Sequence, residues 1–158
     1  MTVYLEDLEP GTEFVSAGRT VTEADIVAFA GLSGDYNPLH TDEVWVRAHT
    51  PFSGRIAHGA LVLSISEGLR TPVLDELEVL AFVEITRSFV APTYPGDTIH
   101  ARWAVTGRRR SRSRPSAGVV TLTVEVEKQD GTVVQHGTDV YLVAVRPESL
   151  VAVAPESR

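Results

Sequence analysis

The sequence predicts an α+β fold in which a curved antiparallel β-sheet wraps around a long central helix. Three observations support this prediction: a helical pattern early in the chain, an apolar run of helical length after it, and later segments that alternate between apolar and polar residues. Helices followed by consecutive strands are typical of an α+β arrangement with an antiparallel sheet, rather than of alternating βαβ units.

The first helix is predicted by a capping box, in which Thr22 is followed three residues later by Asp25. Gly31 and Gly34 are expected to end this helix, because glycine favours helix termination. A second short helix is expected over residues 42–49.

The central helix is predicted over residues 57–69, where small and apolar side chains occupy nearly every helical face. Half-buried strands are then expected wherever apolar residues recur at every second position. Turns are predicted at 94–97 and, as a two-residue hairpin, at Asp130–Gly131; a last strand is predicted over 138–145, with a frayed tail after Pro147. The apolar strand positions are Val83, Ile85 and Phe89, then Ile99, Ala101, Trp103 and Val105, then Val120, Leu122, Val124 and Val126.

Length and composition indicate one globular domain over residues 1–158. The formal charge of −7 argues against nucleic-acid binding, and a chain without cysteine has neither disulfides nor thiolate metal sites. No apolar run reaches the roughly 18 residues of a membrane span, and the N-terminal residues lack the pattern of a signal peptide. We therefore expect a cytoplasmic protein with no membrane or nucleic-acid partner.

A candidate catalytic pair lies in the stretch GDYNPLHTD, where Asp35 and His40 flank an Asn-Pro turn. Aspartate and histidine are residues that transfer protons in general acid–base catalysis. Taken alone, this pattern is more often a structural turn, because Asp and Asn cap helices and form Asx-turns.

The wider sequence resembles the MaoC-like dehydratases, a family that includes the (R)-specific enoyl-CoA hydratases. The runs that carry the resemblance are TVTEADIVAFAGLSGDYNPLHTD, GRIAHG, YPGD and SRSRP, and together they span most of the chain. The resemblance implies a hot-dog domain and a homodimer or higher homo-oligomer, with joined sheets and active sites near the subunit interface. Val46, where the family tends to have a small residue, and a longer spacing from His40 to GRIAHG affect the expected shape of the acyl pocket.

The resemblance also implies the roles of individual residues. Asp35 and His40 would be catalytic, and Asn37 would orient their loop or a water. Gly59, at the start of the central helix, would offer a backbone N–H to an enolate-like oxyanion. The reaction would be reversible addition of water to the 2,3-double bond of an enoyl thioester, with His40 activating the water and Asp35 protonating C2; swapped roles stay open.

Several other groups in the sequence are candidates for a functional role. His58 could be a second residue of the site, but such a histidine is more often structural, so it is left out of the catalytic set. The spacing of acidic and histidine residues predicts no metal site. No cofactor is expected beyond coenzyme A as part of the substrate, for which an acyl carrier protein is the alternative carrier. The run RRRSRSR is either a solvated loop or a basic rim that binds the phosphates of coenzyme A through Arg110, Arg112 and Arg114.

Two alternative functions remain at this point. A hot-dog thioesterase would hydrolyse the same class of substrate and would use an acid on the central helix, for which Glu67 is the candidate. A non-catalytic partner subunit of a heteromeric dehydratase is the other alternative, and the presence of both Asp35 and His40 argues against it.

Overall fold

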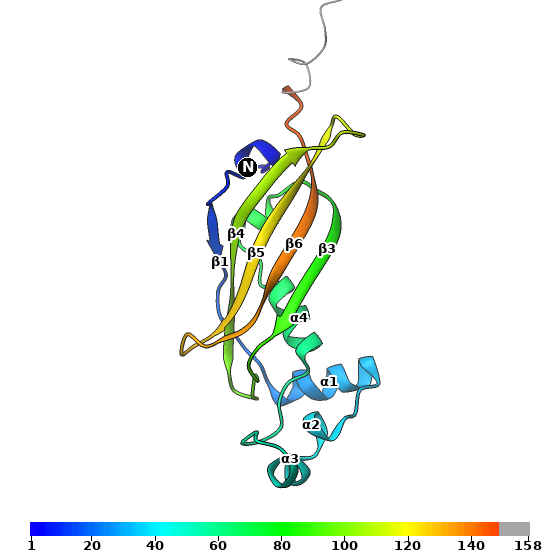
Figure 1. The fold of residues 1–158 in the computed structure, drawn as a ribbon, viewed down its shortest axis with the longest axis vertical. Coiled ribbons are helices and arrows are strands. Elements are labelled where there is room, and N and C mark those ends of the chain that lie inside the picture. Colours follow the sequence, from blue (N-terminus) through cyan, green and yellow to red (C-terminus); the bar gives the residue numbers. More distant parts are fainter. Residues whose placement is uncertain (149–158) are drawn as a thin grey trace, which may run out of the picture.

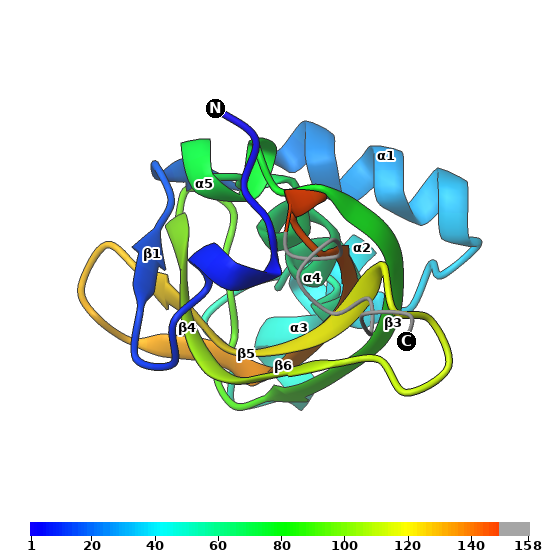
Figure 2. The ribbon, with the colours of Figure 1, turned by 90° about the horizontal axis from the view of Figure 1, so that it is seen from above.

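The computed structural model describes residues 1–148 and contains one antiparallel sheet curved around a helix (Figure 1). The strand order is β1-β4-β5-β6-β3, and β2 pairs with β4. Seen from above, the sheet curves around α4, which lies on the concave side of the sheet (Figure 2). The strands are β1 (Glu13–Val15), β2 (Arg19–Thr20), β3 (Val79–Phe89), β4 (Thr98–Arg110), β5 (Ala117–Lys128) and β6 (Val133–Ala144).

The helices separate into a central one, α4, and a group at one end of the sheet. Helices α1, α2 and α3 lie beside the N-terminal end of α4 (Figure 1). No helix within residues 1–148 is long and apolar enough to cross a membrane. The helical elements are η1 (Leu5–Asp7), α1 (Glu23–Ser33), α2 (Pro38–Thr41), α3 (Glu43–His49), α4 (Gly59–Gly68) and α5 (Pro72–Asp75).

The predicted start of α1 is confirmed. The Thr22 hydroxyl accepts a hydrogen bond from the Asp25 backbone N–H, and the Asp25 carboxylate accepts one from the Thr22 backbone N–H. Gly34 ends the helix in the left-handed region at φ 77°, a conformation that favours glycine. The prediction for Gly31 was wrong, because this residue lies inside α1. The predicted helix over 42–49 is confirmed as α3.

The core forms between α4 and the concave face of the sheet. The predicted apolar rows of β4 and β5 are buried, as expected, from Ile99 to Val105 and from Val120 to Val126. The central helix is not buried on every side: Ala60 and Ser64 are exposed, because no element within residues 1–148 covers the open side of α4.

Strand β3 departs from the prediction of a half-buried strand. Its apolar side chains, among them Val83, Ile85 and Phe89, are exposed, because in the described part of the chain β3 is an edge strand that pairs with β6 on one side alone. The residue of β3 with a buried side chain is instead Arg87, which is 2% exposed. The chain therefore presents an apolar sheet edge and buries a charge beside it.

The turns agree with prediction in place but not always in length. Tyr94–Asp97 forms the expected turn, with Gly96 at φ 94°. The β5–β6 hairpin is one residue longer than predicted, because the Lys128 N–H bonds across the turn to the carbonyl of Thr132. Strand β6 begins at Val133, earlier than expected. The predicted fraying after Pro147 falls almost wholly on residues 149–158, outside the described residues.

Candidate active site

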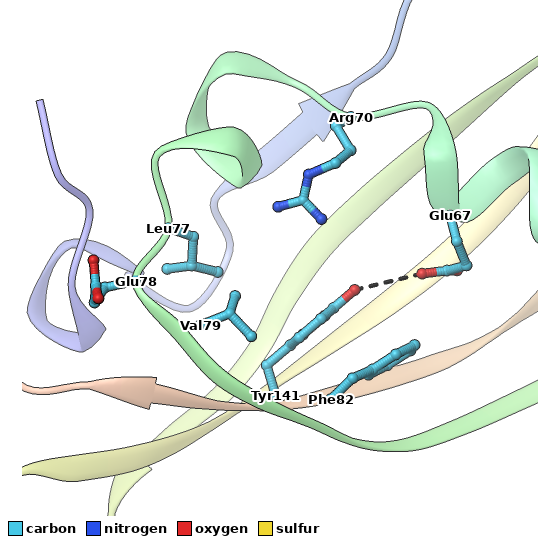
Figure 3. Close-up of a pocket in the computed structure, with 7 residues that line it drawn as sticks. All are labelled: Glu67, Arg70, Leu77, Glu78, Val79, Phe82 and Tyr141. Atoms are coloured by element: carbon cyan, nitrogen blue, oxygen red, sulfur yellow. Dashed lines mark hydrogen bonds between the residues drawn. The ribbon is translucent and has the colours of Figure 1, made fainter.

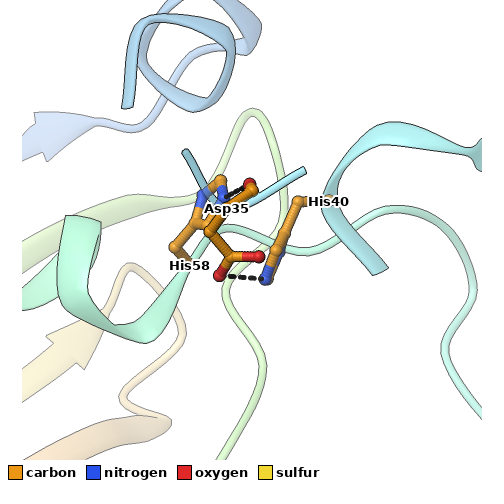
Figure 4. A group of neighbouring side chains, drawn as sticks. All are labelled: Asp35, His40 and His58. Carbon is orange, nitrogen blue, oxygen red and sulfur yellow. Dashed lines mark hydrogen bonds and ion pairs between the residues drawn. The ribbon is translucent and has the colours of Figure 1, made fainter. Parts of the chain in front are cut away.

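Asp35 and His40 come together at the end of α1 and on α2. Asn37 caps α2, since its side-chain oxygen accepts from the Leu39 N–H at 3.0 Å, and Pro38 is the first helical residue. GDYNPLHTD is therefore a capped helical turn rather than an open loop. His40 Nε2 lies 3.9 Å from Asp35 Oδ2 (Figure 4).

The hydrogen bonds of His40 determine which ring nitrogen can act as a base. Its Nδ1 lies 2.8 Å from the carbonyl oxygen of Ile56, and a carbonyl only accepts, so Nδ1 carries the hydrogen in the neutral ring. The lone pair is then on Nε2, which faces Asp35. A separation of 3.9 Å is too long for a direct hydrogen bond, and a water about 2.8 Å from each atom would contact both.

Asp35 presents one carboxylate oxygen to His40 and uses the other locally. Its Oδ1 accepts from the Asn37 backbone N–H at 3.1 Å, which orients the carboxylate. The side chain is about half exposed in the single chain. Oδ2 therefore stays accessible to a reacting group.

His58 belongs to the same cluster, which its interpretation as a structural histidine did not anticipate. Its ring stacks on His40 with centroids 3.7 Å apart, and the Phe29 ring lies 5.1 Å away. His58 Nε2 donates to the backbone carbonyl of Asp35 at 2.9 Å, while Nδ1 is buried without a partner among the described residues. His58 thus contacts both catalytic candidates, His40 through its ring and Asp35 through its hydrogen bond. The feature of the sequence that could have indicated this role is its position directly before Gly59.

Ligand atoms of Asp35, His40 and His58 all lie within 4.8 Å of one another, a grouping that their spacing in the sequence did not indicate. Their geometry suits proton transfer better than a metal ion. The two imidazole rings stack at an interplanar angle of 27°, so their in-plane lone pairs do not converge on one point. His58 Nε2 is also committed to the Asp35 carbonyl.

Gly59 is the first residue of α4, where a backbone N–H has no acceptor within the helix. A Cβ at this position would lie 3.0 Å from the Phe89 ring, so glycine allows the ring to pack against the helix start. Beside Gly59 is a mainly apolar cavity of about 290 Å³, whose walls include Phe52, Val62 and Phe89. Close packing therefore accounts for the glycine and is compatible with a backbone N–H donor that has no acceptor within the helix.

The segment before α4 is tied to the elements that carry the cluster. The Ile56 N–H donates to the Leu39 carbonyl at 3.1 Å, while the Ile56 carbonyl accepts from His40. Arg55 bonds to Glu23 of α1 through its side chain and to Glu43 of α3 through its backbone N–H. That backbone bond, helped by Arg47, holds the pKa of Glu43 below its ordinary value.

The arginine run lies at the other end of the sheet from α1–α3 (Figure 1). Arg110 ends β4 and pairs with Glu6 at 3.0 Å, while Arg112 and Arg114 lie in the loop between β4 and β5. Within one chain the structure does not bring these arginines to Asp35 and His40.

A second cavity, of about 400 Å³, lies at the C-terminal end of α4. Glu67 and Tyr141 meet in its wall at 3.4 Å (Figure 3). Arg87 Nη2 joins Glu67 to the fully buried Asp139, at 2.5 and 2.7 Å. Burial raises the pKa values of the Glu67 and Asp139 carboxyl groups, although the positive charge of Arg87 opposes this rise. Burial also raises the pKa of the Tyr141 hydroxyl.

This ionic cluster was not predicted, although the sequence carried a signal. Asp139 is in phase with Tyr141 and Val143 on the apolar face of the predicted last strand, and Arg87 is in phase with Ile85 on β3. A charge in phase with apolar positions indicates a buried ionic group.

A curved antiparallel sheet around one helix, with an Asp–His pair at the helix start, defines a hot-dog domain equipped for acid–base chemistry. The family model described as MaoC like domain matches residues 7–129. The chain belongs to this MaoC-like family.

Known relatives and solved structures agree with this assignment. An (R)-specific enoyl-CoA hydratase of Rhodospirillum rubrum is 39% identical over 107 residues, which cover 66% of this chain and 70% of that protein. A solved MaoC-like dehydratase from Rhodospirillum rubrum superposes with a TM-score of 0.82 at 35% identity, covering 92% of this chain and 99% of the other. A protein from Mycobacterium tuberculosis described as a double hotdog fold supports the fold alone, with a TM-score of 0.81 at 23% identity, over 93% of this chain and 46% of the other.

Protein MaoC of Klebsiella aerogenes is 36% identical over 99 residues. That match covers 63% of this chain and 29% of the relative, so this chain matches only one part of that longer relative.

Proposed function

We propose that the protein reversibly hydrates the 2,3-double bond of an enoyl thioester carried by coenzyme A or an acyl carrier protein. The observation that carries the proposal is the His40 Nε2 lone pair facing the Asp35 carboxyl at 3.9 Å. The pair lies next to the free N–H groups at the start of α4, a suitable place for an oxyanion.

The geometry supports a definite division of roles. His40 Nε2 takes a proton from the bridging water as its oxygen bonds to C3, and electron density moves through C2 to the thioester oxygen. The Gly59 N–H stabilises that oxyanion, and the Asp35 carboxyl in its protonated form delivers a proton to C2. Transfer of the proton from His40 to Asp35 restores the starting state. Asn37 orients Asp35 through its backbone N–H.

We further propose that the protein is a homodimer joined through β3. An exposed edge strand with apolar side chains offers unpaired backbone groups and apolar surface to a second copy. The exposed apolar residues include Phe82, Val83 and Phe89. A twofold axis at the middle of β3 would pair the two β3 strands antiparallel and so join the two sheets, as the resemblance implies.

Such a dimer bears on the proposed role of the arginine loop. Antiparallel pairing reverses the second sheet, so the partner's β4–β5 loop would lie toward the end that holds Asp35 and His40. A coenzyme A phosphate contact from Arg112 and Arg114 would then come from the other subunit. Arg110 is less suited, because it already pairs with Glu6.

The thioesterase alternative receives less support. Glu67, its candidate acid, is bonded to Arg87 and to Tyr141 and lies at the far end of α4 from the Asp35–His40 pair. The partner-subunit alternative also receives less support, since the chain contains the complete Asp35, His40 and His58 cluster.

The test is hydration of enoyl thioesters from C4 to C16, followed as loss of the enoyl absorbance. Asp35→Asn and His40→Gln should each lower kcat by roughly 10²–10⁴-fold with a smaller change in KM. The double variant should be little worse than either, because residues that act as a unit are non-additive. His49→Gln is the matched control, since the His49 side chain, among residues 1–148, bonds to the Trp45 carbonyl of its own helix and stacks on the Trp45 ring.

Retention of most hydration activity by a folded Asp35 or His40 variant would overturn the proposal. Release of free thiol in place of hydration would indicate the thioesterase instead. Activity that appears only when a second hot-dog chain is present would indicate the partner subunit.

A further inference from the structure

Gln135 of β6 is a buried amide with one end used and the other end unpartnered. The residue is 2% exposed, and its Nε2 donates to the Gly59 carbonyl at 2.8 Å. This bond fixes the orientation of the amide, because a carbonyl cannot donate. The Oε1 atom is buried and has no hydrogen-bond partner among residues 1–148. A buried acceptor without a donor is unfavourable and calls for an explanation.

The unpartnered oxygen is on a residue that lines the cavity beside the start of α4. Gln135 lines this cavity of about 290 Å³ together with Gly59 and Phe89. Phe89 is the neighbour of Gln135 in the β3–β6 ladder. Apart from Gln135 and Thr93, the side chains of the wall are apolar. The cavity therefore combines an apolar surface with few polar groups, as small-molecule sites do.

We propose that this cavity receives a segment of the thioester that carries an N–H or O–H donor, and that Gln135 Oε1 accepts a hydrogen bond from it. The inference rests on the proposed function, since it takes the ligand to be a thioester held at Gly59. A volume near the lower end of small-molecule sites limits the segment to a short one. Gln135 would then have two roles: its Oε1 accepts a hydrogen bond from the ligand, and its Nε2 holds the Gly59 peptide by donating to the Gly59 carbonyl.

Two parts of a thioester could supply the donor: a hydroxyl or amino group on the acyl chain, or an amide N–H of the pantetheine arm. A site built to hydrogen-bond a donor discriminates against an analogue that lacks it, because the buried acceptor is then left unpaired. The two sources can therefore be separated by deleting one donor at a time from the ligand.

The experiment measures Kd by calorimetry for saturated, unreactive thioesters, so that it does not depend on hydration. One pair of ligands has a hydroxyl or a methyl at the same acyl position, and a second pair has the pantetheine amide or the corresponding ester. The protein variants are wild type, Gln135→Met, and Gln129→Met, which makes the same exchange in the β5–β6 hairpin. Thermal unfolding identifies variants that do not fold.

We expect wild type and Gln129→Met to bind one donor-bearing ligand roughly tenfold or more tightly than its donor-free counterpart. Gln135→Met should bind both members of that pair equally. The inference is overturned if wild type prefers neither donor, or if a folded Gln135→Met keeps the preference. Should Gln135→Met not fold, the preference of wild type between paired ligands still decides. Donor-dependent binding without hydration would refute the proposed function alone.

Discussion

Replacing Arg87 by methionine is expected to destabilise the protein strongly, because the buried Arg87 is the cation between the buried Asp139 and the partly buried Glu67. The Arg87 side chain is 2% exposed and that of Asp139 is fully buried. Arg87 Nη2 lies 2.5 Å from Glu67 and 2.7 Å from Asp139. Methionine has similar length and no charge, so the variant leaves both carboxyl groups without their cation.

Removing one partner of a buried ion pair typically costs about 3–5 kcal/mol, because the remaining charge is uncompensated. For a protein of this size, each kcal/mol corresponds to about 2–4 °C in Tm, so the expected loss is about 6–20 °C. Arg102→Met is the matched control on the same sheet. Arg102 is 39% exposed and lies 3.6 Å from its carboxylate partners, and such surface pairs contribute about 0–1 kcal/mol.

The loss of stability caused by Arg87→Met should increase as the pH rises. Burial raises the pKa values of Glu67 and Asp139, so the folded state holds their protons more tightly than the unfolded chain does. The contribution of these groups to stability is therefore fully present below their ordinary pKa values of 4.5 and 3.8 and is lost as pH rises through the folded values. Without Arg87 the pKa values rise further, so the deficit should widen from acidic toward neutral pH.

Thermal unfolding of wild type, Arg87→Met and Arg102→Met across this pH range measures both effects. A folded Arg87→Met that loses no more Tm than Arg102→Met would refute the reasoning. A deficit that narrows as pH rises would refute the account of the carboxyl groups.

Three further predictions follow from the site and the surface. His58→Phe should keep the ring stack and lose the bond to the Asp35 carbonyl, so kcat should fall about tenfold or more with little change in Tm; unchanged kcat would show that this bond is dispensable. Val83→Lys should convert a dimer to monomers in light scattering, because it places a charge on the apolar edge; a wild-type monomer at micromolar concentration would contradict the dimer. Alanine at Arg112 and Arg114 should raise KM for coenzyme A substrates and leave a short pantetheine thioester nearly unaffected, whereas equal losses would exclude a phosphate contact.

Features that depend on neighbouring residues in the sequence, such as helix caps and strand alternation, were predicted from the sequence. The Thr22–Asp25 capping box fixed the start of α1, and the period-2 rows of β4 and β5 identified the buried face. Gly31 was misread because glycine is tolerated within a helix, and only Gly34 adopts the left-handed conformation that ends one.

Features that depend on tertiary contacts were beyond local signals. The exposure of β3 depends on its place at the sheet edge, which the pattern around Val83 and Ile85 does not reveal. The position of His58 against His40 depends on how α2 docks on the start of α4. Asp35 and His40 were identified as catalytic candidates because of the family resemblance. The structure adds the distance between the two side chains and the tautomer of His40.

Two groups of buried polar side chains lie at opposite ends of α4 and have different consequences. At the C-terminal end of α4, Arg87 lies between Glu67 and Asp139 and pairs with both carboxyl groups, so these groups act on stability within the chain. At the N-terminal end, His58 Nδ1 and Gln135 Oε1 are buried without hydrogen-bond partners among residues 1–148. His58 directly precedes Gly59, and the Gln135 amide bonds to the Gly59 carbonyl. A fold keeps such unpaired groups at a cost in stability. Their position on both sides of the proposed oxyanion donor is therefore best explained if they contact a ligand or positioned water there, rather than serve the packing of the core.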